Sequence, residues 1–330
     1  MPRSLLSRRR ALPLLATLLL ACGLAPTAFA TPAPPAAPAA PAAARQRPQA
    51  PDAVDFKRDV VYGKGGGEDL TLSISRPRDA ERSTRLPCIL VIHGGGWSGG
   101  NKAQHEDLTW QLAQRGYVAA TIGYRLAPKH LFPAAVEDVK CAARYLRAHA
   151  DEYGIDADRL GAIGFSAGGH LSMMLGVTNK EDGLEGEGGS AEQSSRVQAV
   201  VSFFGPTQLD ADDIPERVKG ILRNFIGGTA EEKPDAYRKG SPITYLSSDR
   251  KVAPMLLLQG TADPLVPPTQ AYKMADAMGK AGATGRAEIL PGLGHGWGGA
   301  ELKRSAEVSF AFFDQHLNHQ PPKQASAKEK

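Results

Sequence analysis

The sequence of 330 residues has little cysteine, no long apolar run and, beyond its first residues, no surplus of charge. Its three cysteines, Cys22, Cys88 and Cys141, are too few for a disulfide scaffold. No spacing of cysteine and histidine matches a zinc site, and we expect neither a metal nor a cofactor. Cys88 begins an apolar run and Cys141 lies in a helical pattern, which favours two buried free thiols over one disulfide.

The missing charge surplus limits the partners of the protein. The formal net charge is +4, and the arginines at positions 3, 8, 9 and 10 are the only charged residues of segment 1–30, so the remainder is neutral. This balance excludes the basic face of a nucleic-acid-binding protein and the polybasic patch that binds anionic membranes.

The apolar run behind these arginines is too short for a membrane span. It covers residues 11–24 and is followed by Ala-Phe-Ala at 28–30, a small-x-small cleavage pattern. A span needs about 20 residues, so we interpret segment 1–30 as a secretory signal rather than an anchor and expect an exported, periplasmic or extracellular protein. Ser-Arg-Arg at 7–9 resembles a twin-arginine signal. Leu-Leu-Ala-Cys at 19–22 resembles a lipoprotein box, so contact with a membrane is expected only if Cys22 is lipidated.

The rest of the chain divides by composition. Residues 31–54 are rich in Ala and Pro, cannot bury a core, and are interpreted as a stiff, disordered spacer. A domain is expected over residues 55–318 and a disordered tail over 319–330. Within the domain, residues 206–248 mix charges with apolar patches and are expected to form a small lid. The Gly-, Glu- and Ser-rich segment 179–196 is expected to be a flexible surface loop.

Strand-like and helical patterns alternate through the domain. The expected strands are 56–62, 70–76, 87–92, 117–124, 160–165, 197–204, 254–259 and 286–290. The expected helices between them include 109–115, 132–150, 170–177 and 271–281. The third to seventh strands are mostly apolar, as parallel strands covered on both faces are. This pattern predicts an α/β fold with an eight-stranded, mostly parallel sheet and helices on both faces.

The motif Gly164-Phe165-Ser166-Ala167-Gly168 joins the fifth expected strand to a helical segment. A G-x-S-x-G turn between a strand and a helix is the nucleophile elbow, whose small flanking residues permit a tight turn that exposes the serine. We therefore predict Ser166 as a nucleophile for a carbonyl carbon. The pentapeptide alone is weak support, because so short a pattern also arises by chance.

A catalytic serine needs a base and an orienting carboxylate, and each has one best candidate. Asp263 directly follows the seventh expected strand, and His295 lies in a glycine-rich loop after the eighth. The order Ser166, Asp263, His295 is the one that this elbow requires. Taken singly, the two would be an ordinary turn aspartate and an ordinary loop histidine.

The serine also needs donors for a developing oxyanion. His-Gly-Gly-Gly-Trp at 93–97 follows the third expected strand, where glycines leave backbone N–H groups uncovered. Gly95 and Gly96 are the predicted donors, together with Ala167, the residue after the nucleophile. Trp97 and Trp297 are predicted to bind substrate, with packing beneath the loops as the alternative.

In these motifs the chain resembles the α/β-hydrolase family from about residue 55 to residue 316. The likeness is to esterases related to hormone-sensitive lipase, and among them to bacterial feruloyl- and acetyl-esterase-like proteins. It is carried by residues 93–97, 124–128, 132–138, 164–170, 263–264 and 294–296. The resemblance implies hydrolysis of carboxylic esters without a cofactor, with Ser166 as nucleophile, His295 as proton carrier and Asp263 as its orienting group.

The resemblance also implies that Asp138 pairs with Arg125 instead of acting as a catalytic acid. Many relatives of hormone-sensitive lipase carry an N-terminal helical cap, which the Ala/Pro spacer cannot form. The expected substrates are therefore small-molecule or polysaccharide-linked esters with short-chain or aromatic acyl groups, including acetyl or feruloyl esters of plant polysaccharide.

Other functions of the same fold stay open at this point. They are a small-amide or formamide hydrolase, a peptidase, and an inactive hydrolase that serves as a binding module. The histidines at 105, 130, 149, 316 and 319 are interpreted as surface residues.

Overall fold

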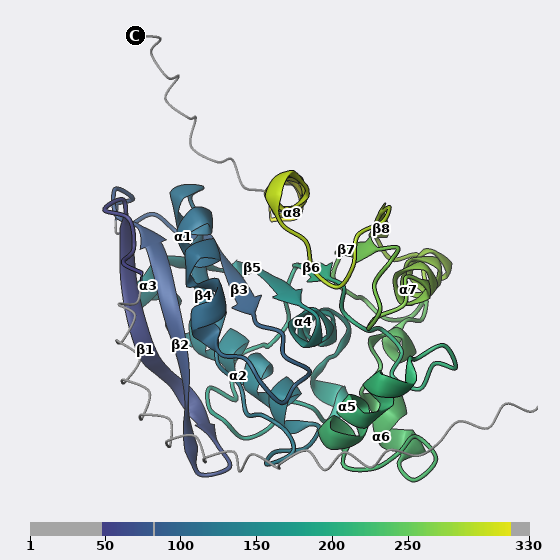
Figure 1. The fold of residues 1–330 in the computed structure, drawn as a ribbon. Helices are drawn as coiled ribbons and strands as arrows, with labels where there is room; N and C mark the ends of the chain where they lie inside the picture. Colours follow the sequence, from purple (N-terminus) through teal and green to yellow (C-terminus); the bar gives the residue numbers. More distant parts are fainter. Residues whose placement is uncertain (1–47, 82, 318–330) are drawn as a thin grey trace, which may run out of the picture. The chain divides into compact units, whose positions relative to one another are not determined.

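The computed structural model describes residues 48–81 and 83–317 (Figure 1). The predicted signal at 1–30, the spacer up to residue 47 and the predicted tail at 319–330 lie outside the described residues. None of the helices in the two described ranges has the length and apolar character that crossing a membrane requires.

Eight strands form one sheet in the order β1-β2-β4-β3-β5-β6-β7-β8. They are β1 (Val54–Gly65), β2 (Glu68–Pro77), β3 (Leu86–Ile92), β4 (Val118–Ile122), β5 (Ile155–Phe165), β6 (Ala199–Phe203), β7 (Met255–Gly260) and β8 (Gly285–Leu290). β2 pairs with β1 and with β4 in antiparallel fashion, whereas the pairs from β4 through β8 are parallel. The predicted fold class, an eight-stranded and mostly parallel α/β sheet, is confirmed.

All eight strands differ from their predicted ranges at one end or both, and two of these differences have a clear physical reason. β5 begins at Ile155, earlier than predicted, because Ile155 pairs with Leu86 across a register shift although polar residues follow it. β1 begins at Val54, inside the predicted spacer, and Val54 is only 1% exposed because it packs against Trp110 and Ala113. The sheet therefore starts where the apolar side chain finds a partner.

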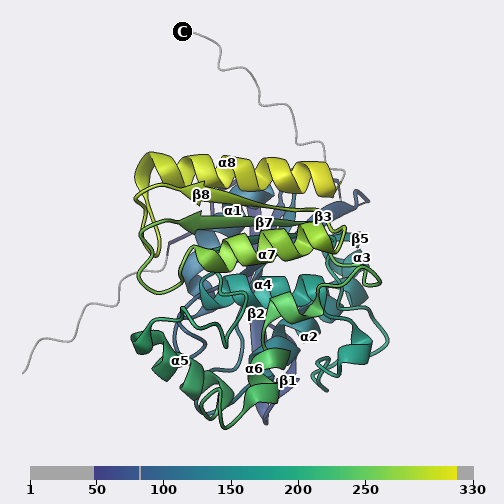
Figure 2. The ribbon, with the colours of Figure 1, turned by 90° about the vertical axis from the view of Figure 1, so that its right-hand side faces the viewer.

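The helices cover both faces of the sheet (Figures 1 and 2). They are α1 (Glu106–Gln114), α2 (Ala134–Ala148), α3 (Ala150–Tyr153), α4 (Ala167–Val177), α5 (Glu216–Ile226), α6 (Pro234–Lys239), α7 (Thr269–Lys280) and α8 (Gly299–His316). Three short 3₁₀ helices are η1 (Lys102–His105), η2 (Lys180–Asp182) and η3 (Pro242–Tyr245). One core joins α1 and α8 to the sheet, and a larger core joins α2, α4 and α7 to its opposite face.

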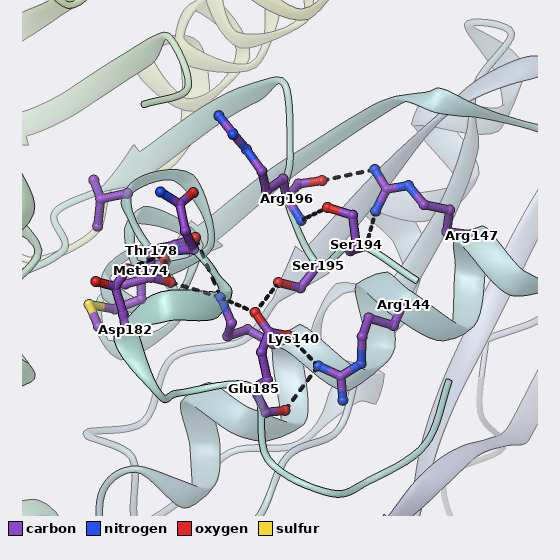
Figure 3. A network of polar contacts seen from close by, with 12 residues as sticks. Lys140, Arg144, Arg147, Met174, Thr178, Asp182, Glu185, Ser194, Ser195 and Arg196 are labelled. Carbon is purple, nitrogen blue, oxygen red and sulfur yellow. Dashed lines mark hydrogen bonds and ion pairs between the residues drawn. The ribbon is translucent and has the colours of Figure 1, made fainter. Parts of the chain in front are cut away.

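The segment 179–196 is not wholly a surface loop. Leu184 and Ser195 are each 3% exposed. Glu185 forms ion pairs with Lys140 (3.0 Å) and Arg144 (2.5 Å), two buried cations of α2 (Figure 3). The composition of the segment concealed this anchor, because both partners of Glu185 lie far away in the sequence.

Cys88 and Cys141 are both buried and free, as predicted. Burial raises the pKa of each thiol, so neither carries thiolate character near neutral pH.

Candidate active site

Ser166 lies in the sharp turn between β5 and α4. Its φ of 54° is positive, which is strained for a residue with a side chain. A Cβ on Gly164 would lie 2.1 Å from the carbonyl oxygen of Gly168, and one on Gly168 would lie 2.1 Å from that of Ile92. Only glycine fits at either position, so the two glycines permit the close approach that forces the serine outward.

The structure brings Ser166 together with His295 and Asp263 from the loops after β8 and β7. His295 Nε2 lies 2.9 Å from Ser166 Oγ, and His295 Nδ1 lies 2.8 Å from Asp263 Oδ2. An ionised carboxylate only accepts, so Nδ1 carries the proton and Nε2 is left to accept the serine proton. The arrangement is that of a nucleophile with its base and an orienting group.

The carboxylate of Asp263 is held from several sides. Its Oδ1 accepts hydrogen bonds from the N–H groups of Leu265 (2.8 Å) and Val266 (2.9 Å). Burial alone would raise the pKa of Asp263, but the hydrogen bonds from His295 and from these N–H groups outweigh it and lower the pKa. Asp263 is therefore ionised at neutral pH.

Gln259 is a site residue that the sequence did not reveal. It is 1% exposed at the end of β7. Its Nε2 donates to Asp263 Oδ2 (3.0 Å) and to the carbonyl oxygen of Val266 (2.9 Å). A polar residue at the end of an otherwise apolar strand was the available signal, and Gln259 fixes the rotamer of the carboxylate.

The loop at 93–97 has an unusual backbone. Gly95, Gly96 and Trp97 have consecutive positive φ values of 117°, 58° and 56°. Among the described residues, the N–H groups of Gly95, Gly96 and Ala167 have no recorded protein acceptor. A Cβ on Gly95 would lie 2.2 Å from the carbonyl oxygen of Gly99. The turn thus requires glycine at position 95, and Gly95 and Gly96, whose N–H groups have no protein acceptor among the described residues, line one pocket together with Ser166.

Trp97 is fixed by a buried histidine. Its Nε1 donates to His170 Nδ1 (3.2 Å), and His170 Nε2 donates to the carbonyl oxygen of Gly240 (2.6 Å). The Trp97 ring also stacks on Phe225 of α5, with centroids 4.4 Å apart. Burial lowers the pKa of His170 to about 4, so the imidazole is neutral and keeps this donor and acceptor pattern at neutral pH. His170 thereby joins the glycine loop, α4 and the end of α6.

The ion pair expected between Arg125 and Asp138 is confirmed. The Arg125 backbone N–H donates to Asp138 Oδ2 (2.7 Å), and its guanidinium lies 2.7 Å from Oδ1. Asp138 is 1% exposed, and both of its carboxylate oxygens are held by Arg125. Ala127, two residues after Arg125, donates its N–H to the carbonyl oxygen of Trp97 (2.9 Å). The segment that follows β4 therefore braces the glycine loop.

Ser166 faces a small pocket of about 80 Å³. The pocket is lined by Gly96, Trp97, Ser166, Pro206, Ile214, Val218, Ile221, Leu222, Leu265 and Val266. Its walls are almost entirely apolar, and those from Pro206 to Leu222 belong to the predicted lid segment. Trp97 lines this pocket although it is only 3% exposed, so it both packs beneath the loops and contributes to the pocket wall.

Ser166 also faces a large pocket of about 480 Å³. Its lining is Gly94, Gly95, Gly96, Ser98, Gln104, His105, Phe165, Ser166, Phe204, Ile221, Leu265 and His295. The prediction that His105 is a surface residue was wrong. It is half-buried and stacks on Phe165, with centroids 4.3 Å apart, because η1 folds over the end of β5.

Trp297 lines neither of these two pockets. It packs against Phe203 and Phe204, with centroids 5.7 Å and 5.2 Å away, and donates its Nε1 to Ser305 Oγ (3.0 Å). The structure therefore separates the two tryptophans that the sequence grouped together.

The fold and this arrangement define an α/β hydrolase. The model of the BD-FAE family matches residues 72–278, and the chain belongs to this family. Esterase LipC of Mycobacterium tuberculosis is 30% identical over 270 residues, which are 78% of this chain and 65% of LipC. The probable carboxylic ester hydrolase LipM of the same organism is 34% identical over 67% of this chain and 51% of its own length. The chain thus spans less than two thirds of the length of these relatives.

Solved structures agree with this family. A truncated form of a carbohydrate esterase from gut microbiota has a TM-score of 0.71 and 28% identity, covering 82% of this chain and all of its own. Native Est2, a thermophilic esterase of Thermogutta terrifontis, has a TM-score of 0.69 and 28% identity, covering 83% of this chain and 96% of its own. Est2 has also been solved with propionate bound, with butyrate bound and phosphorylated by paraoxon.

Proposed function

We propose that the protein is a serine carboxylesterase that works through an acyl-enzyme. The observation that carries this proposal is the continuous hydrogen-bonded chain from Ser166 through His295 to Asp263, with spacings of 2.9 Å and 2.8 Å. The esterases named above support it, and so does Est2, whose phosphorylation by paraoxon is a reaction expected of an activated nucleophile.

The proposed reaction has two halves. Ser166 Oγ attacks the ester carbonyl carbon while His295 Nε2 takes the hydroxyl proton, and the new oxyanion accepts from the N–H groups of Gly95, Gly96 and Ala167. When the tetrahedral intermediate collapses, the ester C–O bond breaks and His295 gives its proton to the leaving alcohol. Water then attacks the acyl-enzyme by the same route and releases the acid.

The two pockets differ in what they can accept. Because His295 must protonate the leaving alcohol, the alcohol belongs in the large pocket, which His295 lines, and the acyl group belongs in the small one. The volume of about 80 Å³ is roughly half the 150 Å³ of a cavity that binds benzene in another protein, which suits an acetyl or propionyl chain. We therefore propose short acyl chains, and this assignment favours acetyl over feruloyl esters. The propionate and butyrate complexes of Est2 are consistent with it.

The natural alcohol is a finer proposal. The carbohydrate esterase among the structural neighbours supports a carbohydrate-linked ester, and together with the small acyl pocket we propose an acetylated plant polysaccharide. Initial rates on acetylated xylan and on methyl ferulate test the two polysaccharide-linked esters against each other, with turnover of acetylated xylan expected.

The acyl preference is tested with p-nitrophenyl acetate, butyrate, octanoate and palmitate, which share one leaving group. We expect kcat/KM to fall steeply with chain length and activity to vanish in Ser166→Ala. A folded protein that hydrolyses none of these esters would contradict the proposal and favour the amidase, peptidase or binding-module alternatives.

We also propose that the protein is exported. The arginines, apolar run and small-x-small pattern of residues 1–30 support this proposal. Mass spectrometry of the N-terminus from native cells tests it. A chain that starts after residue 30 indicates signal cleavage, a lipid on Cys22 indicates a lipoprotein, and an intact Met1 contradicts export.

A further inference from the structure

A third hollow, of about 280 Å³, lies between α1 and α8 next to the ends of β5 and β6. We call it the aromatic cleft and define it by Leu108, Phe165, Phe204, Trp297, Ala306 and Phe310, which line it. No step of the proposed reaction uses it. α1 and α8 cover the same face of the sheet (Figure 1). Side chains from both helices line the cleft.

The cleft meets the large pocket. Gln104, His105, Phe165 and Phe204 line both hollows. The ring of Phe204 lies 4.6 Å from that of His295 and 5.2 Å from that of Trp297, measured between centroids. The cleft therefore begins beside the base, on the side to which the leaving alcohol was assigned.

The walls of the cleft favour an apolar occupant. Trp297 Nε1 already donates to Ser305 Oγ (3.0 Å), and Ser309 Oγ already donates to the Ser305 carbonyl oxygen (2.7 Å). The carboxamides of Gln104 and Gln111 and the carboxylate of Asp107 belong to exposed residues at the rim. A sugar ring would bring several hydroxyl groups to walls that are mostly apolar and where the hydroxyls of Ser305 and Ser309 are already bonded.

The volume of the cleft suits one ring. A cavity of about 150 Å³ in another protein is large enough to bind benzene, so 280 Å³ accepts a phenyl group together with a short linking chain. Aromatic walls also favour aromatic occupants, because stacked and edge-on ring pairs add to the gain from burial.

We propose that the aromatic cleft is a leaving-group subsite that binds an aromatic ring on the alcohol portion of the ester. This inference rests on the proposed function and extends it. The reaction itself is unchanged: the ester C–O bond breaks and the arylalkyl alcohol leaves with the proton of His295. The cleft adds affinity for one class of alcohol, of which 2-phenylethanol is the simplest probe.

The test compares 2-phenylethyl acetate with ethyl acetate, two esters with the same acyl group. We expect the wild type to prefer 2-phenylethyl acetate by roughly tenfold or more in kcat/KM, the gain expected for burying a ring. Ala306→Phe fills the cleft from α8 and should abolish this preference while leaving ethyl acetate turnover unchanged. Ala311→Phe is the matched control, because Ala311 is exposed on the same helix and does not line the cleft.

A second variant and a binding measurement keep the test decisive if Ala306→Phe fails to fold. Leu302 is 42% exposed at the rim of the cleft, so Leu302→Ala should fold and reduce the preference several-fold. Calorimetric titration of Ser166→Ala with 2-phenylethanol should show binding that Ala306→Phe removes in the double variant.

The outcomes separate the two proposals. Hydrolysis of ethyl acetate with no aryl preference, or with a preference that survives Ala306→Phe, overturns the subsite and leaves the esterase proposal standing. Loss of turnover of an acetylated methyl xyloside, rather than of the aryl ester, in Ala306→Phe would assign the cleft to sugars and overturn the inference. No hydrolysis of any ester, with 2-phenylethanol still bound, overturns the proposed function and the leaving-group role together, and leaves only the affinity of the cleft for an aromatic ring.

Discussion

Two carboxylates, the buried Asp263 and the partly buried Glu185, each hold a cationic or basic side chain but serve different purposes. Asp263 holds His295 at 2.8 Å, and Glu185 holds Lys140 at 3.0 Å. The imidazole has a second nitrogen, which reaches Ser166 at the edge of an open pocket. The ammonium of Lys140 is fully buried and donates a further hydrogen bond to Thr178 Oγ1 (2.9 Å; Figure 3). Asp263 therefore contributes to a reactive site, because its partner His295 keeps a second nitrogen whose lone pair faces Ser166. Glu185 does not, because its partner Lys140 is fully enclosed.

The two regions should therefore fail in different ways. Damage around Asp263 should cost catalysis and leave folding nearly intact, because the site is already strained and partly open. Damage around Glu185 should cost stability and leave turnover by the folded fraction intact.

The largest effect is expected for Ser166→Ala. Removing Oγ removes the nucleophile, and the loss of kcat should reach roughly four to six orders of magnitude. The free energy of unfolding should stay close to the wild-type value, because the lost hydroxyl is half-exposed. Steady-state kinetics beside urea unfolding checks both statements, and substantial residual turnover would remove Ser166 from the mechanism.

The next effect is expected for Asp263→Asn. The amide keeps the shape of the side chain but offers His295 the wrong tautomer, which should lower kcat by about 10⁴. Burst kinetics on p-nitrophenyl acetate measures it. Gln259→Leu is a milder companion that should lower kcat without removing the charge, and equal losses in both variants would contradict the roles given to them.

Glu185→Gln should reverse this pattern. It leaves Lys140 and Arg144 buried without their anion, which should lower the free energy of unfolding by about 3–5 kcal/mol. Urea unfolding gives the change, while kcat measured well below the transition should match the wild type. A folded variant with normal stability and low kcat would show that Glu185 supports catalysis, and would contradict the structural role given to it.

Acid should weaken the stabilisation that the ion pairs of Glu185 provide. Burial would raise the pKa of Glu185, but its interactions with Lys140, Ser195 and Arg144 outweigh burial and lower the pKa below its ordinary value of 4.5. Since the folded pKa lies below the unfolded one, the stabilisation is complete above pH 4.5 and is lost as the pH falls through the folded value. The difference in unfolding free energy between the wild type and Glu185→Gln should shrink from pH 6 toward pH 3, and a constant difference would argue against ionisation as its source.

The smallest effect is expected for His170→Ala. Without its acceptor, Trp97 loses the bond that fixes the turn beside the oxyanion donors, and kcat should fall by about tenfold with little change in KM. His170→Gln, which can still accept and donate, should recover part of the loss. An effect confined to stability would make His170 a packing residue only.

The sequence predicted the local parts of the site better than its surroundings. The glycines around Ser166 and in the turn after His93 stand in short, recognisable motifs, although the need for glycine at 168 comes from its approach to Ile92 of the neighbouring strand. Gln259 escaped notice and His105 was interpreted as a surface residue, because each matters through contacts with residues that lie far along the chain. The anchor of Glu185 on α2 escaped for the same reason.

Sequence alone determined the strand and helix alternation, the elbow at Ser166 and the chain order that ends at His295. Apolar periodicity and backbone sterics act over a few residues, so the sequence alone reveals them. Tertiary structure alone decided which carboxylate faces a base and which faces a buried lysine, and it separated Trp97 from Trp297. Those outcomes depend on which loops the folded sheet brings together, since burial and partner distance exist only after the chain has packed.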